Sequence, residues 1–276
     1  MSSTTHPKGM QRPTETTTSG GENRQDARKR YRLEGVLWVI GLIVFIIACV
    51  TIHLHPQPYP VDLSTTEAVQ HANTPAPILD VVNFPSLLNN PIPSAVALII
   101  WIFGLLLLGL IAKLRRSAAV LWVMSAFFLA IAVMSSTGLN VLFDEIVGRP
   151  RPNPHTEPIQ LHTPLVPFPT FPSGHTEHDI VYYGFLLYLS FTKPVREWRY
   201  HWWLLPFQLY AVFDIIAIGY SRIYLGDHWL TDVLGGYLEG AVYLFLFIFL
   251  YRWATGVIAK WLDKRRSRSV QSYAAR

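Results

Sequence analysis

The residues best suited to chemistry lie in one short run, SRIYLGDHWLTD, at positions 221–232. This run places Arg222, His228 and Asp232 at the edge of a strongly apolar segment. His228 and Asp232 are four residues apart, so in a helix they lie on one face. A cation, a nucleophilic imidazole and a carboxylate that orients it are groups that phosphoryl transfer needs. An isolated His–Asp pair at a membrane boundary also has a simpler interpretation, in which the two side chains only satisfy each other.

Two further clusters favour the chemical interpretation. In FPSGHTEHD, Ser173 and Gly174 precede His175 at a predicted helix start, where free N–H groups and the helix dipole attract anions. An alternative interpretation of Ser173 is that it is an ordinary helix N-cap. In GRPRP, Arg149 and Arg151 are each followed by proline, and guanidinium groups on a stiff segment suit bidentate phosphate binding. The alternative for these arginines is a basic anchor beside the membrane.

With these motifs the chain resembles the type 2 phosphatidic acid phosphatase superfamily, which includes membrane lipid phosphatases and soluble vanadium haloperoxidases. Its signatures are Lys, six residues and Arg-Pro; then Pro-Ser-Gly-His; then Ser-Arg, five residues, His, three residues and Asp. The second is complete at 172–175 and the third at 221–232, within a resemblance that covers roughly residues 94–253. The first is partial, because Arg151 and Pro152 fit its end whereas Asp144 stands at the position of the lysine.

The resemblance implies a role for each motif residue. His228 would attack phosphorus and form a phosphohistidine, Asp232 would hold its other ring nitrogen, and His175 would protonate the leaving oxygen. The expected phosphate ligands are Arg151, Arg222, Ser173 and Gly174, with Arg149 supplying the charge of the missing lysine. No metal and no other cofactor is expected, because arginines supply the charge that Mg²⁺ provides at other phosphoryl-transfer sites.

The expected function is that of an integral membrane phosphatase that hydrolyses a lipid phosphate or an isoprenyl diphosphate. Two alternatives stay open. One is a lipid phosphotransferase that uses an alcohol in place of water. The other is a phosphatase-like lipid-binding protein with impaired catalysis, because Asp144 replaces the lysine. The expected partners are the substrate lipid and the bilayer, and a nucleic-acid partner is not expected.

Composition indicates a membrane protein independently of the motifs. Hydrophobic residues make up 51% of the 276 residues and charged residues only 15%, too few to cover the surface of a water-soluble chain. Apolar segments of the length needed to cross a bilayer, some of them interrupted by acids, predict an all-α polytopic bundle of six transmembrane helices. These segments lie at about 36–52, 92–112, 118–143, 175–191, 202–222 and 229–253.

The chain is predicted to have three parts. They are a disordered basic tail at 1–32, a six-helix membrane phosphatase domain at 33–255 with its motif-bearing core at 94–253, and a basic tail at 256–276. Basic residues recur near 28–32, 113–116, 193–199 and 260–268. By the positive-inside rule these groups and both termini face the cytoplasm.

All three motifs then face away from the cytoplasm in a multi-pass protein of the cell membrane. Residues 53–91 are expected to form a loop on the same side. Gly235, Gly236 and Gly240 are expected to permit close helix packing.

Overall fold

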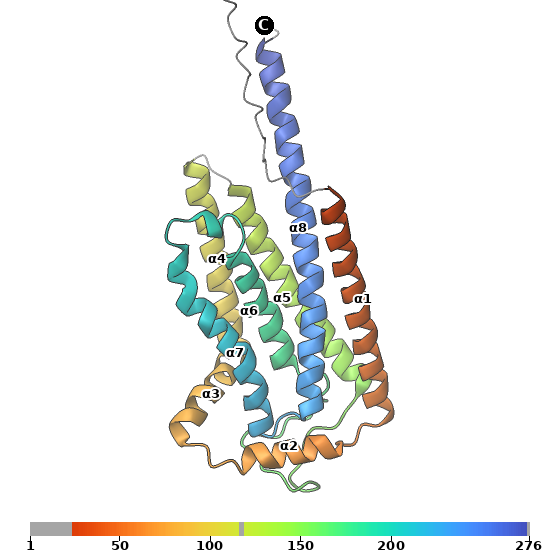
Figure 1. Cartoon of the computed structure of the whole chain (residues 1–276). Coiled ribbons are helices and arrows are strands. Elements are labelled where there is room, and N and C mark those ends of the chain that lie inside the picture. The colour runs from red at the N-terminus through yellow and green to blue at the C-terminus, as the bar shows by residue number, and fades with distance from the viewer. Residues whose placement is uncertain (1–23, 116–118, 275–276) are drawn as a thin grey trace, which may run out of the picture. The chain divides into compact units, whose positions relative to one another are not determined.

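The computed structural model describes residues 24–115 and 119–274, which form an all-α protein as the sequence predicts (Figure 1). The α-helices are α1 (Arg24–Leu54), α2 (Pro60–Gln70), α3 (Ala76–Leu88), α4 (Pro91–Leu114), α5 (Ala119–Val147), α6 (Gly174–Ser190), α7 (Leu205–Tyr224) and α8 (Leu230–Ala274). Two short 3-10 helices, Val195–Glu197 and His201–Leu204, connect α6 to α7. Residues from Trp38 onward form one compact unit, and the start of α1 up to Leu37 belongs to a separate unit. The helices and sites described below lie in the unit that begins at Trp38.

Within the described residues, five helices are long and apolar enough to cross a membrane. These candidate spans are Arg28–Leu54, Pro91–Leu114, Ala119–Val147, His201–Tyr224 and Leu230–Leu262. The sixth predicted segment is α6, a helix of only 17 residues. The described chain is therefore a helical bundle with five candidate spans, and α6 is a shorter helix among them.

The hydrophobic core lies where α6 meets its neighbours. Leu129 of α5, Val181 and Phe185 of α6, and Ala211 of α7 are all 0% exposed. α6 contacts α5, α7 and α8, so protein surrounds much of its surface. Such a helix needs less continuous hydrophobicity than one that faces lipid on most sides, and this explains the acids within its sequence.

Glycines bring α8 against the beginning of α6, as the sequence predicts. A Cβ atom at Gly236 would lie 2.4 Å from the carbonyl oxygen of Ser173, and one at Gly240 would lie 2.9 Å from that of Glu177. A Cβ atom at Gly235 would lie 2.4 Å from the ring of Phe171. Only glycine fits these positions without a shift of the neighbouring backbone or ring.

The prediction of a loop at 53–91 is wrong, because this segment contains α2 and α3. The inward-facing residues of α2 include the polar Asp62 and Thr66, so its sequence lacks the apolar stripe that marks most surface helices. α3 contains Pro85 near its end, a residue that normally indicates a helix boundary. Both helices lie at one end of the bundle (Figure 1).

The predicted tails differ in part from the structure. Residues 1–23 lie outside the described residues, whereas 24–32 form the first turns of α1. α8 continues as a helix to Ala274, through most of the segment predicted as the C-terminal tail.

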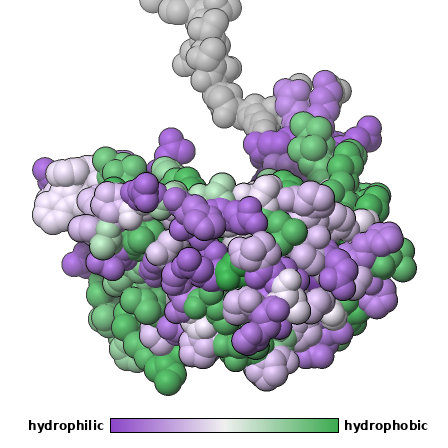
Figure 2. All heavy atoms as spheres, turned by 90° about the horizontal axis from the view of Figure 1, so that it is seen from below, coloured by the Kyte–Doolittle hydropathy of each residue, from purple (hydrophilic) through white to green (hydrophobic). Residues whose placement is uncertain are grey.

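The end of the bundle that carries α2 is largely polar. Figure 2 shows this end, where hydrophilic residues cover most of the surface and hydrophobic residues lie mainly toward its border. This distribution suits a surface in water that is surrounded by a lipid-facing belt.

Candidate active site

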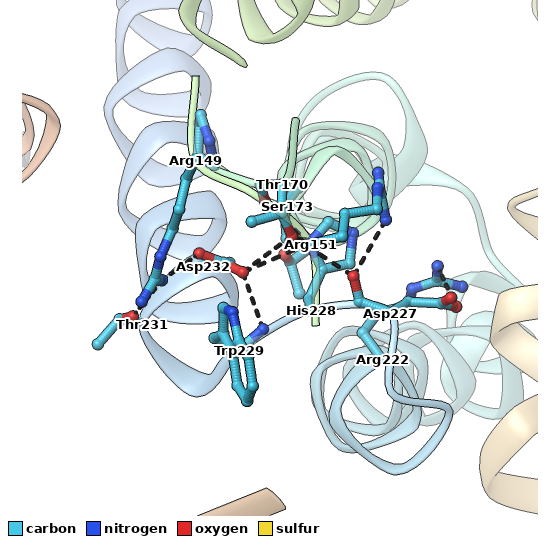
Figure 3. A network of polar contacts seen from close by, with 12 residues as sticks. Arg149, Arg151, Thr170, Ser173, Arg222, Asp227, His228, Trp229, Thr231 and Asp232 are labelled. Atoms are coloured by element: carbon cyan, nitrogen blue, oxygen red, sulfur yellow. Dashed lines mark hydrogen bonds and ion pairs between the residues drawn. The ribbon is translucent and has the colours of Figure 1, made fainter. Parts of the chain in front are cut away.

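The three motifs converge at this polar end. The connection from α5 to α6 supplies Arg149, Arg151 and Thr170, the start of α6 supplies Ser173, Gly174 and His175, and the turn from α7 to α8 supplies Arg222, His228 and Asp232. Figure 3 shows His228 between Asp232 on one side and Arg222 on the other. Segments far apart in the sequence therefore build one site.

His228 is held at Nδ1 by Thr170. This nitrogen donates a hydrogen bond to the main-chain oxygen of Thr170 at 2.9 Å, and the Thr170 hydroxyl oxygen also lies 2.9 Å away. Since a main-chain carbonyl can only accept, Nδ1 carries the proton and Nε2 keeps its lone pair. The ring is 3% exposed and is fixed as the tautomer that a nucleophile requires.

Asp232 supports this arrangement indirectly, which differs from the expected direct bond to His228. The Asp232 carboxylate lies 3.9 Å from Nδ1, beyond hydrogen-bonding distance. Its Oδ2 instead accepts hydrogen bonds from the Thr170 hydroxyl at 2.9 Å and from the Trp229 N–H at 2.8 Å. Thr170 therefore connects the carboxylate to the imidazole, a role that no sequence motif indicates.

The surroundings of His228 favour its neutral form. Burial, then the positive charges of Arg151 and Arg222, and then the neighbouring His175 hold the pKa of His228 well below its usual value. Because the folded-state pKa is lowered, the imidazole stays neutral from alkaline pH down to values below its usual pKa. A neutral imidazole is the form in which a histidine can act as a nucleophile.

Several buried polar atoms around His228 have no partner among the described residues. They are Oγ of Ser173, Nε2 of His175 and Nε of Arg222. A buried polar atom without a partner costs free energy, so such atoms at one place indicate a polar ligand. The first N–H groups of α6 also point outward from the helix start, where they suit an anion.

Arg222 and Arg151 keep donors for such an anion. Arg222 forms an ion pair through Nη2 with Asp227 at 2.5 Å, which leaves its Nε free. Arg151 donates from Nε to the main-chain oxygen of Phe168 and from Nη1 to the main-chain oxygen of Asp227, both at 3.0 Å. These two bonds use two of its five N–H donors.

Arg149 differs from its neighbour, because its guanidinium group is fully buried and bonded within the protein. Its side chain is 0% exposed and lies between the carboxylates of Asp62 and Asp232. It therefore does not occupy the place of a phosphate ligand that its sequence position indicates. The expectation that Arg149 replaces the missing lysine has no support in this geometry.

Asp144, at the position of the lysine, lies near the end of α5. Its Oδ1 atom is buried and has no hydrogen-bond partner in the described part of the chain. Arg151 and Asp232 are its main charged neighbours besides Glu145. A carboxylate therefore stands beside the candidate site, close to one of the arginines.

Among residues 24–115 and 119–274 there is no group of three or more His, Cys, Asp or Glu side chains suited to hold a metal ion. The charge at the site comes from arginines, which match phosphate geometry well.

The sequence did not point to Thr170 or Asp62. Thr170 lies three residues before Ser173 in a segment rich in proline, and Asp62 lies in a segment expected to be a loop. The one available signal was that Asp62 follows Pro60 in the pattern of a helix start.

Comparison with known proteins agrees with the motifs. Residues 126–256 match the PAP2 superfamily. Phosphatidylglycerophosphatase B of Bacillus subtilis (strain 168) is 32% identical over 117 residues, a match that covers 39% of this chain and about half (49%) of that protein. The crystal structure of a transmembrane PAP2 type phosphatidylglycerolphosphate phosphatase from Bacillus subtilis superposes with a TM-score of 0.57. At 21% identity it covers 77% of this chain and 94% of the solved chain, which shows a shared fold. Every candidate catalytic residue named above lies inside the segment that matches the PAP2 superfamily.

Proposed function

We propose that this protein is an integral membrane phosphatase that hydrolyses a lipid phosphate or an isoprenyl diphosphate, with its active site on the extracytoplasmic side. The observation that carries this proposal is the environment of His228. Its Nδ1 is held by Thr170, and Arg151, Arg222 and His175 lie close enough to lower its pKa. Such a histidine is suited to act as a nucleophile, because it lies near two cations and near His175, the proposed proton donor.

The proposed reaction has two steps. In the first, Nε2 of His228 attacks phosphorus and the bond from phosphorus to the lipid oxygen breaks, while His175, in the imidazolium form that a bound phosphate dianion stabilises, gives its Nε2 proton to that oxygen and becomes neutral. In the second, water attacks the phosphohistidine, His175 takes a proton from this water, and the P–N bond breaks to release phosphate. Arg151 and Arg222 stabilise the charge on the phosphoryl oxygens in both steps.

Two observations support a lipid substrate. The related protein is named for a phosphatase of phosphatidylglycerophosphate, so a phospholipid phosphomonoester is the first substrate to test. An apolar cavity of about 720 Å³ also adjoins the site, lined by α1, α2 and α8 together with Phe171. A hydrocarbon chain is the natural occupant of a cavity of this composition.

Phosphate release from the purified protein tests the proposal. We expect release in detergent from phosphatidylglycerophosphate, phosphatidate or an isoprenyl diphosphate, and a loss of about a thousandfold or more in His228→Ala. Labelled substrate should leave an acid-labile, base-stable protein phosphate in the wild type. His228→Ala should lose this label, whereas His175→Ala should retain it with a substrate whose leaving group needs no proton.

The same experiment separates the alternatives. Transfer of the phosphoryl group to an added alcohol in preference to water would indicate a phosphotransferase. Binding of the lipid without release or transfer would indicate a lipid-binding protein, and an unchanged label in His228→Ala would contradict the assigned nucleophile.

A further inference from the structure

The Arg149 guanidinium uses every one of its donors inside the protein. Nη1 donates to Asp232 Oδ1 at 2.5 Å and to Thr231 Oγ1 at 2.7 Å. Nη2 donates to Asp62 Oδ2 at 2.7 Å and to the Gln57 oxygen at 3.4 Å, and Nε donates to the Pro56 oxygen at 3.2 Å. A guanidinium group has five N–H donors, so none is left for a substrate.

Asp62, on the first turn of α2, is the second member of this arrangement. It is 0% exposed, and its Oδ1 accepts hydrogen bonds from the Thr231 N–H and hydroxyl, both at 2.9 Å. Its Oδ2 accepts the Tyr59 N–H at 3.0 Å besides the bond from Arg149. A buried carboxylate with both oxygens this fully bonded has one fixed position.

These bonds reach His228 through Asp232. One oxygen of Asp232 accepts from Arg149, and the other accepts from the Thr170 hydroxyl and the Trp229 N–H. The main-chain oxygen of Thr170 in turn accepts a hydrogen bond from Nδ1 of His228. In Figure 3 Asp232 lies between Arg149 and Thr170. Arg149 and Asp62 are therefore three and four contacts from the nucleophile, and neither one touches it.

We propose that Asp62 and Arg149 are positioning residues that fix Asp232, and through it the ring orientation of His228, in the phosphatase reaction. This inference rests on the proposed function. Without the fork of Arg149, Asp232 Oδ1 loses its charged partner, and the carboxylate is free to rotate away from Thr170. Without the charge of Asp62, the Arg149 fork loses one of its two anchors. α2 carries no superfamily motif, yet through Asp62 it helps to position the nucleophile.

Conservative variants test this role with little change in side-chain volume. Arg149→Lys keeps the charge but loses the fork, and Asp62→Asn keeps the shape but loses the charge. We expect each to lower kcat by about ten- to a hundredfold, the size of the loss when a metal-bound histidine loses the partner that orients it, while KM changes by less than about threefold. Because both act through Asp232, the double variant should lose little more than the worse single variant.

Two matched controls separate positioning from folding and from binding. Asp214→Asn removes an equally buried carboxylate in α7, which accepts the Tyr210 hydroxyl at 2.7 Å, and should change the melting temperature without changing kcat. Arg151→Lys should raise KM, because Arg151 keeps donors for phosphate. All rates are measured on monodisperse protein, and Asp62→Asn carries the test alone if Arg149→Lys does not fold.

The outcomes are distinguishable from a failure of the proposed function. A wild-type protein that neither releases phosphate nor forms a phosphohistidine would overturn the proposed function. A wild-type protein that does both, together with Arg149→Lys and Asp62→Asn variants that keep kcat and change at most KM, would overturn the positioning role.

Discussion

The two arginines of GRPRP have different environments although they are two residues apart. Arg149 is enclosed by carboxylates and main-chain oxygens, whereas Arg151 keeps donors beside His228. Pro150 between them favours polyproline geometry, which has three residues per turn. In this geometry residues two apart face different directions. A dipeptide repeat in the sequence thus gives one internal arginine and one that is available to a ligand.

Asp144 is the residue that separates this chain from the superfamily signature. With Arg149 fully bonded, the phosphate charge must be balanced mainly by Arg151 and Arg222. A carboxylate near Arg151 competes with phosphate for that arginine. Under the proposed function, the chain therefore combines a complete set of candidate catalytic residues with fewer cations for the phosphate.

Asp144→Lys should consequently strengthen substrate binding. We expect KM to fall by roughly ten- to a hundredfold, because a charge-assisted hydrogen bond contributes about 1.5–3 kcal/mol, and kcat to change little. Asp144→Asn is the matched control, since it removes the repulsion without adding an ammonium group and should give a smaller fall. Steady-state phosphate release over a range of lipid concentrations measures both. A loss of activity in Asp144→Lys would instead mean that the carboxylate holds Arg151 in place.

At the scale of elements, close contact between α6 and α8 sets the distance between the two candidate catalytic histidines. His175 lies in the first turn of α6 and His228 lies two residues before α8 begins. The Ser173 N–H donates to the main-chain oxygen of Asp232 at 3.0 Å, and this bond joins the two helix starts directly. Gly236 allows this approach because the Ser173 oxygen occupies the space of a side chain there.

Gly236→Ala should therefore reduce activity and stability together. The added methyl group must displace the backbone at Ser173, and overpacking of this kind costs about 1–3 kcal/mol. Gly256→Ala is the matched control in the same helix, because a Cβ atom there meets no atom within 4 Å. It should leave activity unchanged and raise the melting temperature slightly, since alanine favours the helix by up to about 1 kcal/mol. Equal activity of the two variants would contradict the role given to Gly236.

Sequence patterns predicted the long apolar helices and the residues of the three motifs, because these depend on local hydrophobicity and on short spacings. These patterns did not predict α2 and α3, because the inward-facing residues of both helices make polar contacts with distant parts of the chain. Asp62 bonds to Arg149, and Ser86 of α3 bonds to Ser221 of α7 at 2.7 Å. A polar residue that is buried by a partner far away in the chain looks identical in sequence to one in a loop. The same reason hid Thr170 and led to the interpretation of Arg149 as a phosphate ligand.

At the scale of the whole molecule, the structure has a polar catalytic end and an opposite end with basic residues. A cavity of about 570 Å³ at this second end is lined by Arg115 at the end of α4 and by Val195, Glu197 and Trp198 after α6. The ends of α4 and α6 therefore lie together. Lys113, Lys193 and Arg196 also belong to these segments, so the positive-inside rule favours this end as cytoplasmic.

This arrangement bears on the number of spans. If α4 and α6 end on the same side of the membrane, then α6 crosses it, although its 17 residues extend only roughly 25 Å at 1.5 Å per residue. A bilayer core is about 30 Å thick. Protein covers much of α6, because it contacts α5, α7 and α8. A short helix in this position avoids the cost of hydrophobic mismatch that a lipid-exposed helix would have.

Cysteine labelling on intact cells distinguishes six spans from five. Replacement of Cys49, the only cysteine in the chain, by serine gives a background without thiols. A membrane-impermeant maleimide should then label Thr156→Cys, on the exposed catalytic loop, from outside. Arg196→Cys and Lys260→Cys, also exposed, should react only after permeabilisation, because six crossings place both on the cytoplasmic side. If α6 does not cross, Arg196→Cys lies on the same side as Thr156→Cys and reacts in intact cells. Reaction of Lys260→Cys in intact cells, with protection of Thr156→Cys, would reverse the proposed orientation of the active site.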